Sequence, residues 1–197
     1  MFDAAPKIFI SLACFSDPDV VSTIKDAIAK AHCPQRLVFG VCLQADVNDT
    51  QYDILSSINS VRIDRISIEY ARGPIYARTR CDNLMRDEPF FLQLDCHSRF
   101  LQKWDQTLIE ELLVCEELSG CSVLSHYPMN MADFREQKNF DQIGHINRYR
   151  LINAQNIASH GSLITLPERP LESISVSGAL IFMRSEDRRS HPYDPEL

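Results

Sequence analysis

The stretch Phe91-Leu92-Gln93-Leu94-Asp95-Cys96-His97 is an apolar segment that ends in an Asp-x-His motif. Such a segment is typical of a buried strand, and ligands of open α/β sheets gather at the carboxyl ends of the strands. In extended chain, side chains two residues apart point to the same side. The spacing therefore predicts that Asp95 and His97 face one ion together while Cys96 points away. A carboxylate and an imidazole suit a divalent ion such as Mn²⁺ or Mg²⁺.

Other interpretations of this motif stay open. Asp95 could cap the segment that follows, and His97 could be an ordinary surface residue. A thiol nucleophile at Cys96 is not favoured, because neighbouring residues on a strand point apart. A metal-dependent phosphohydrolase would need further carboxylates around the ion, and the sequence contains no second acidic motif of that kind.

Apolar segments and helical patterns alternate on both sides of this stretch. Strands are expected at Lys7–Phe15, Arg36–Gln44, Ile63–Tyr70, Pro89–Asp95 and Cys121–Ser125. Helices are expected between them, at residues 17–31, Tyr52–Ser60, residues 73–85 and Trp104–Glu117. Nearly all-apolar strands that alternate with helices predict an α/β fold, with a mostly parallel sheet and helices on both faces.

The C-terminal third has a different character. Residues 131–160 are polar and show no clean period, which predicts a long irregular excursion with a helix near Arg150–Ala158. Strands are expected at Ser162–Leu166 and Ile174–Arg184, before a polar tail. Residues 1–197 contain no repeat, so a single domain is expected, with the excursion shaping the acceptor side of the site.

The composition narrows the classes of function. The 197 residues carry a formal net charge of −7, which disfavours nucleic-acid binding. No apolar run has the length of a membrane span, and the N-terminus does not resemble a signal peptide. The seven cysteines are odd in number and include no Cys-x-x-Cys pair. Reduced thiols in a cytoplasmic protein are therefore expected, rather than a disulfide framework or a zinc cage.

Two further segments are candidate ligand sites. Gly73-Pro74 opens a helix whose N-terminus attracts phosphate, and Arg78, about one turn along, could reach the same anion. Alternatively, Arg78 pairs with Asp82 on a solvated helix. At the end of the first strand, a nucleotide base could lie against Phe15, although a core Phe15 followed by a helix cap at Asp17 explains the same residues.

The order of these segments resembles that of a known family. The segments are Ile8–Ser11, Asp17-Pro18, Arg36–Gln44, Gly73-Pro74 with Ala77-Arg78, Phe91–Phe100 and Trp104-Asp105. From about Lys7 to its end, the chain resembles the polypeptide N-acetylglucosaminyltransferases typified by the enzymes that glycosylate hydroxyproline on a ubiquitin-ligase subunit. The resemblance implies a GT-A (Rossmann-like) fold, UDP-GlcNAc as the sugar donor, a divalent metal (Mn²⁺ or Mg²⁺) and retention of anomeric configuration.

The resemblance also implies roles for individual residues. Asp95-Cys96-His97 fills the family's Asp-Ser-His metal motif, with Cys in place of Ser. Arg78 matches an Ala-Arg position near the diphosphate, and Ser177-Gly178 resembles a small-residue turn beside the donor sugar. The residues expected to bind the donor are Ser11, Phe15, Arg78, Gln93, Ser177 and Gly178. No residue is assigned to catalysis itself.

The chain departs from the family pattern after Pro192-Tyr193-Asp194-Pro195. In the family an acidic Gly-Glu-Glu stretch and acceptor-side elements follow, whereas this sequence stops at Leu197, so we expect it to be C-terminally short. Two functions stay open: transfer of GlcNAc or a similar sugar to a polypeptide or glycan acceptor, and a non-catalytic or partial nucleotide-sugar-binding module. A missing segment would expose apolar surface, so a homo-oligomer is also open.

Overall fold

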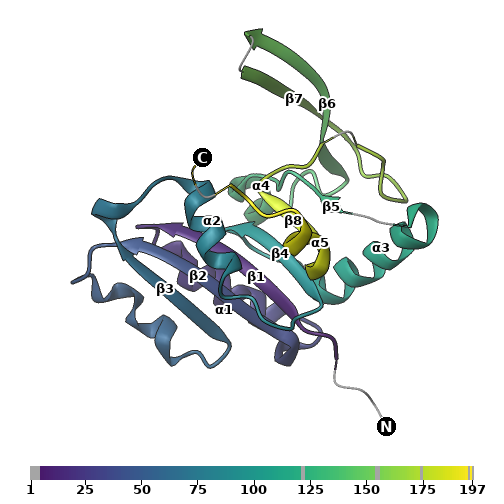
Figure 1. Cartoon of the computed structure of the whole chain (residues 1–197). Helices are drawn as coiled ribbons and strands as arrows, with labels where there is room; N and C mark the ends of the chain where they lie inside the picture. Colours follow the sequence, from purple (N-terminus) through teal and green to yellow (C-terminus); the bar gives the residue numbers. More distant parts are fainter. Residues whose placement is uncertain (1–4, 121–122, 154–155, 174, 195, 197) are drawn as a thin grey trace.

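The computed structural model describes residues 5–120, 123–153, 156–173, 175–194 and 196. A six-stranded sheet in this part of the chain has the order β3-β2-β1-β4-β8-β5 (Figure 1). The first four of these strands are parallel, whereas β8 runs antiparallel to both β4 and β5. The strands are β1 (Ile8–Phe15), β2 (Leu37–Ala45), β3 (Val61–Ser67), β4 (Phe90–Asp95), β5 (Leu124–Ser125) and β8 (Leu180–Arg184). The predicted mostly parallel α/β sheet is confirmed.

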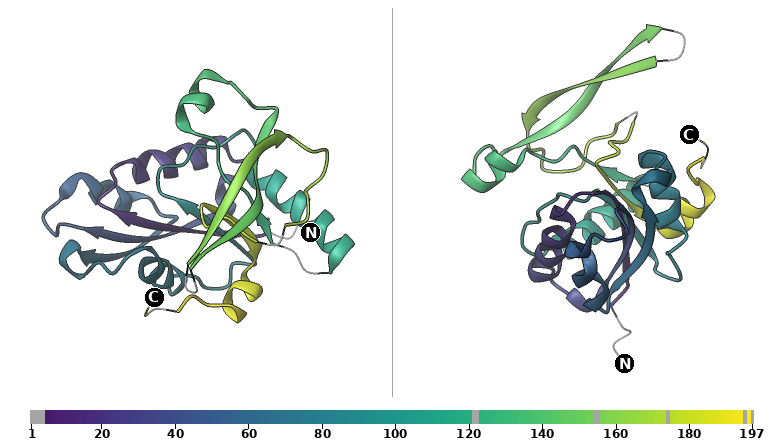
Figure 2. Two further views of the ribbon diagram at one scale, coloured as in Figure 1. Left: turned by 90° about the horizontal axis from the view of Figure 1, so that it is seen from above. Right: turned by 90° about the vertical axis from the view of Figure 1, so that its left-hand side faces the viewer.

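Helices pack against both faces of the sheet (Figures 1 and 2). α1 (Asp19–Lys30), α3 (Trp104–Ser119) and the 3₁₀ helix η2 (Thr50–Ser57) share one apolar core with alternate residues of β1 and β2. α2 (Pro74–Asp82) and α5 (Ser185–Ser190) cover the other face. Because both faces of the central strands are buried, their sequences are apolar at consecutive positions, as predicted.

Element boundaries differ from the prediction where local turns replace regular structure. The segment predicted as a helix at Tyr52–Ser60 is the 3₁₀ helix η2, and the end of the predicted third strand is η3 (Ile68–Tyr70). The strand predicted at Ile174–Arg184 is confined to β8, and the tail after it forms α5. Shorter elements are η1 (Pro34–Arg36) and α4 (Met131–Glu136), and residues 121, 122 and 174 lie outside the described part of the chain.

The irregular excursion predicted for residues 131–160 is wrong, as is the helix near Arg150–Ala158. In its place, β6 (Gln142–Asn153) and β7 (Asn156–Thr165) form a long antiparallel hairpin that projects away from the sheet (Figures 1 and 2). Side chains such as Leu151, Ile152 and Leu163 are exposed. Where the described side chains of a strand face solvent, its sequence lacks the alternation of apolar and polar residues by which strands are recognised.

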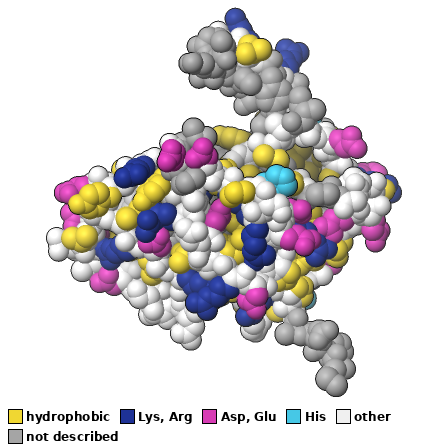
Figure 3. Space-filling model, in the orientation of Figure 1, with side chains coloured by type: hydrophobic (Ala, Val, Ile, Leu, Met, Phe, Trp, Pro, Cys, Tyr) yellow, Lys and Arg dark blue, Asp and Glu magenta, His cyan; other side chains and the backbone are white. Residues whose placement is uncertain are grey.

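The face of the molecule shown in Figure 3 carries acidic and basic side chains interspersed, with apolar side chains in the recess beneath the hairpin. Among the described residues, no helix is long and apolar enough to cross a membrane. The six described cysteines are free thiols, and four of them are buried. Cys121 lies outside the described residues.

Candidate functional site

The carboxyl edge of the parallel strands brings together residues that are far apart in the sequence. β1 ends at Phe15 and β4 at Asp95, and Ala13 pairs with Asp95 in the register of the sheet. Parallel strands end at the same edge, so the segments that follow β1 and β4 lie side by side. The N-termini of α1 and α2 lie at this edge for the same reason.

Asp17, Cys96 and His97 form a compact cluster on the α1 side of the sheet. Each offers a possible ligand atom, and these atoms all lie within 4.8 Å of one another. His97 Nδ1 lies 3.0 Å and Cys96 Sγ 3.6 Å from Asp17 Oδ2. The other Asp17 oxygen accepts a 2.9 Å hydrogen bond from the N–H of Asp19, the first residue of α1, so Asp17 contacts both the start of α1 and His97.

The ionisation of this cluster follows from its contacts. Partial burial opposes the charge of Asp17, but the Asp19 N–H and His97 outweigh it and lower the pKa of Asp17. Asp17 is therefore a carboxylate at neutral pH. Contact with Cys14, together with burial, raises the pKa of Cys96 far above its ordinary value. A protonated, buried Cys96 is a poor nucleophile, in agreement with the sequence analysis.

A second group of polar residues lies on the α2 side of the same edge. Arg78 Nη2 donates a 3.0 Å hydrogen bond to the Gly178 carbonyl oxygen and lies 3.5 Å from Asp95 Oδ1. Gln93 Nε2 donates to the same carbonyl at 2.7 Å. Gln93 Oε1 accepts a 2.8 Å hydrogen bond from Tyr193, to which sequence analysis gave no role. Segments 100 residues apart in the sequence therefore meet at Gly178.

Arg78 has no ion pair with Asp82, the alternative that its spacing suggested. Asp82 instead pairs with Arg188 of α5, whose Nε lies 2.9 Å from Asp82 Oδ2. The guanidinium of Arg188 also lies over the ring of Tyr193. Burial raises the pKa of Asp82, although the Arg188 guanidinium opposes the shift. Asp82 is therefore paired with Arg188, whereas Arg78 contacts Gly178 and Asp95 at the carboxyl edge of the sheet.

The two residues predicted to share an ion contact different neighbours in this structure. Asp95 contacts Arg78 on the α2 side, whereas His97, whose side chain is 61% exposed, contacts Asp17 on the α1 side. Cys96 does not point away from His97, because both side chains approach Asp17. The reason is that β4 ends at Asp95 and the chain turns there, so the strand's alternation does not extend to Cys96 and His97.

The other predicted donor residues occupy different environments. Ser11 is fully buried in the middle of β1, so the structure does not place it at the ligand edge, a correction to the prediction. Phe15 is the last residue of β1 and is 59% exposed, which leaves its ring open to a ligand. The Ser177 N–H donates a 2.6 Å hydrogen bond to Ser125 Oγ, which fixes the turn that carries Gly178.

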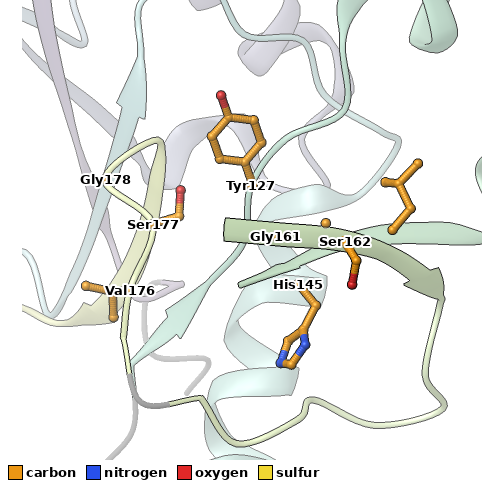
Figure 4. A pocket seen from close by; sticks show the side chains of 9 residues that line it. Tyr127, His145, Gly161, Ser162, Val176, Ser177 and Gly178 are labelled. Atoms are coloured by element: carbon orange, nitrogen blue, oxygen red, sulfur yellow. The ribbon is translucent and has the colours of Figure 1, made fainter. Parts of the chain in front are cut away.

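A cleft of about 480 Å³ opens between this turn and the base of the hairpin (Figure 4). It is lined by Tyr127, Gly144, His145, Gly161, Ser162, Leu163, Val176, Ser177 and Gly178. Sequence reasoning missed the hairpin's contribution because it predicted no strands at Gln142–Asn153. The cleft joins the predicted donor-sugar turn to the segment expected to shape the acceptor side.

The sequence matches the family model described as "Glycosyltransferase (GlcNAc)" over residues 7–58 and 45–197. Among solved structures, the mannosyltransferase PcManGT from Pyrobaculum calidifontis, in complex with GDP-Man and Mn²⁺, superimposes with a TM-score of 0.57 at 10% identity, covering 100% of this chain and 52% of that one. S. aureus TarS 1-349 has a TM-score of 0.52 at 14% identity, covering 97% and 51%. At these identities the likeness shows the fold alone, and this chain spans about half the length of either structure. No curated protein matches the sequence.

Proposed function

We propose that this chain, which belongs to the GlcNAc glycosyltransferase family, binds a UDP-sugar and transfers the sugar to a hydroxyl acceptor. We further propose that the sugar is GlcNAc and that its anomeric configuration is retained, as in the hydroxyproline-modifying enzymes that the sequence resembles. The observation that carries the proposal is the convergence of Arg78, Asp95 and the Gly178 carbonyl with Asp17 and His97 at one sheet edge.

The residues at this edge fit a divalent ion such as Mn²⁺ or Mg²⁺. Asp95 is a half-exposed carboxylate, and His97 is an exposed imidazole. Asp17 beside Nδ1 favours a proton on that nitrogen, which leaves the Nε2 lone pair of His97 free to bind metal. We propose Asp95 and His97 as the metal ligands. The bound ion would offset the negative charge that develops on the departing diphosphate.

The remaining residues bind and orient the donor. Arg78 presents its guanidinium to the diphosphate, because the side chain is already fixed at the edge by the Gly178 carbonyl. Phe15 is exposed and offers an apolar face to the uracil base. Gln93 holds the Gly178 carbonyl and Ser177 anchors the same turn, so both position the donor-sugar side of the site.

A second candidate is a non-catalytic nucleotide-sugar-binding module. The contacts described at the sheet edge are assigned to the donor and its metal, and none of these residues is assigned to catalysis. Both proposals include donor binding. Release of GlcNAc from UDP-GlcNAc, or its transfer to a polypeptide or glycan, distinguishes them, because the binding module does neither.

Thermal unfolding with UDP, with Mn²⁺ and with both tests the donor site. A ligand at one hundred times its dissociation constant stabilises a protein by about 2.7 kcal/mol. We expect UDP to raise the unfolding temperature only with Mn²⁺ present, and the shift to disappear in Asp95→Asn and His97→Ala. His160→Ala, on the exposed hairpin, is the matched control and should respond like the natural chain. If UDP with Mn²⁺ does not shift the natural chain, the proposal is wrong.

A further inference from the structure

The Asp17, Cys96 and His97 cluster has a chemistry that the proposed donor site does not use. A carboxylate, a thiol and an imidazole offer ligand atoms within 4.8 Å of one another. Asp17 follows β1, whereas Cys96 and His97 follow β4. The donor's metal requires neither the sulfur of Cys96 nor the direct approach of Cys96 and His97 to the same Asp17 oxygen. The cluster therefore calls for an explanation of its own.

The distances within the cluster match those between the ligands of a tetrahedral zinc ion. Zinc binds sulfur at about 2.3 Å and carboxylate oxygen or imidazole nitrogen at about 2.1 Å, so tetrahedral angles place sulfur and oxygen about 3.6 Å apart, and nitrogen and oxygen about 3.4 Å apart. Cys96 Sγ lies 3.6 Å from Asp17 Oδ2, and His97 Nδ1 lies 3.0 Å from it. All three ligand atoms lie within 4.8 Å of one another, and the exposed His97 side chain can adjust to the slightly longer nitrogen–oxygen separation that zinc requires.

The polypeptide around the cluster holds the ligands in place. Thr23 Oγ1 donates a 2.8 Å hydrogen bond to the Cys96 carbonyl oxygen, which fixes the turn after β4 to α1. Asp17 Oδ1 is fixed by the Asp19 N–H at 2.9 Å, and Oδ2 is left for the cluster. Cys96 is buried, whereas Asp17 and His97 are open to solvent on one side. An ion can therefore enter from that side and keep one water ligand.

We propose that Asp17, Cys96 and His97 bind one Zn²⁺, with water in the fourth position. A thiolate with an imidazole selects zinc over the oxygen-seeking Mn²⁺ and Mg²⁺, and binding replaces the thiol proton of Cys96. His97 would then bind zinc through Nδ1, the ring nitrogen that lies next to Asp17. One consequence rests on the proposed function: zinc and the donor's metal compete for His97, so bound zinc weakens donor binding.

Titration of the full chain with Zn²⁺ in competition with a chromophoric chelator tests the site. We expect one equivalent of zinc to bind, and Co²⁺ in its place to give a thiolate-to-cobalt charge-transfer band. Second-shell changes already weaken metal sites by 10- to 100-fold, so removal of the sulfur ligand in Cys96→Ser should weaken zinc binding by about 100-fold or more and abolish the band. Cys115→Ser, at a part-exposed thiol on α3, is the matched control and should bind zinc normally.

Asp17→Asn separates ligand loss from misfolding, because Asn keeps an oxygen that can accept the hydrogen bond from the Asp19 N–H at the start of α1. We expect this variant to unfold at a similar temperature and to bind zinc more weakly. Absence of the cobalt band in the natural chain, or equal zinc affinity of Cys96→Ser and the natural chain, overturns the proposal. Zinc binding with the band but without any UDP binding leaves the zinc site standing and rejects the proposed function.

Discussion

Substitution of Arg78 tests the proposed diphosphate contact most directly. Arg78 Nη2 lies 3.0 Å from the Gly178 oxygen and 3.5 Å from Asp95, so its guanidinium is already fixed at the ligand edge before a donor binds. A charge-assisted hydrogen bond contributes about 1.5–3 kcal/mol, which corresponds to about 10- to 150-fold in affinity. We therefore expect Arg78→Ala to weaken UDP binding by that factor. The UDP affinity of Arg78→Lys should lie between those of Arg78→Ala and the natural chain, because lysine keeps the charge but loses the planar guanidinium.

The same substitution should leave the fold intact. The Gly178 carbonyl also accepts from Gln93 Nε2 at 2.7 Å, so loss of Arg78 leaves no unpaired carbonyl at this turn. We expect the free energy of unfolding to fall by about 1 kcal/mol, the typical cost of a point substitution. A variant that is folded but binds UDP weakly would therefore report a lost ligand contact.

The assay is calorimetric titration of UDP into the chain with Mn²⁺ present. The matched control is Arg80→Ala, two residues along the same helix, where the guanidinium binds Asp64 through hydrogen bonds of 2.6 and 2.8 Å. Arg80→Ala should lower the unfolding temperature without changing UDP affinity. If Arg78→Ala binds UDP as tightly as the natural chain, the assignment of Arg78 to the diphosphate is wrong.

Two further predictions concern the fold. Gly40→Ala should destabilise the chain by about 1–3 kcal/mol in thermal unfolding, because the added Cβ would lie 2.2 Å from the Phe9 ring, which is fully buried; unchanged stability would contradict the packing of β1 on β2. The hydrogen bond from Arg184 lowers the pKa of Glu116 below 4.5, so the stability of this pair is present above pH 4.5 and is lost as the pH falls through the lower folded-state pKa. The difference in unfolding temperature between the natural chain and Arg184→Gln should therefore shrink below pH 4.5, and a constant difference would argue against the pair.

Burial explains which strands could be predicted from sequence. Every residue of β2 is buried, and the side chains of β1 alternate between the α1 core and the α2 core, so both segments are apolar at nearly every position. In the hairpin strands β6 and β7, by contrast, several of the apolar side chains that the structure describes are exposed, among them Leu151, Ile152 and Leu163. The pairing of β6 with β7 depends on backbone hydrogen bonds, which leave no trace in the hydrophobic pattern.

The candidate site was predictable only up to the end of the strand. The position of Asp95 and Arg78 at this edge could be predicted, because a strand end and a helix N-terminus are local signals. The contact between His97 and Asp17 was not predicted, because Asp17 lies 80 residues away in the sequence and was interpreted as the helix cap, a position that Pro18 occupies. The prediction for Ser11 was wrong because Ser11 lies in the middle of β1, where it is fully buried, and not at the end of the strand.

The division of the site by the sheet leads to one more prediction. Arg78 and Asp95 lie on the α2 side, whereas Asp17 and His97 lie on the α1 side. If Asp95 and His97 bind the donor's metal, the ion and the diphosphate together contact residues on both sides. Binding of the ion should then position residues that contact the diphosphate, and binding of the diphosphate should position residues that contact the ion. We therefore expect Mn²⁺ to tighten UDP binding by about 5- to 150-fold, the usual range for coupled ligands.

Titration of UDP at several Mn²⁺ concentrations measures this coupling. The Asp95→Asn variant should reduce it, because it removes the carboxylate that contacts Arg78 on one side and is proposed to bind the ion on the other. Glu69→Gln, at an exposed acidic residue of η3, removes the same charge and should leave the coupling unchanged. If UDP and Mn²⁺ bind independently to the natural chain, the donor and its metal do not contact both sides of the site. His97 then belongs to the cluster with Asp17 and Cys96 and does not bind the donor's metal.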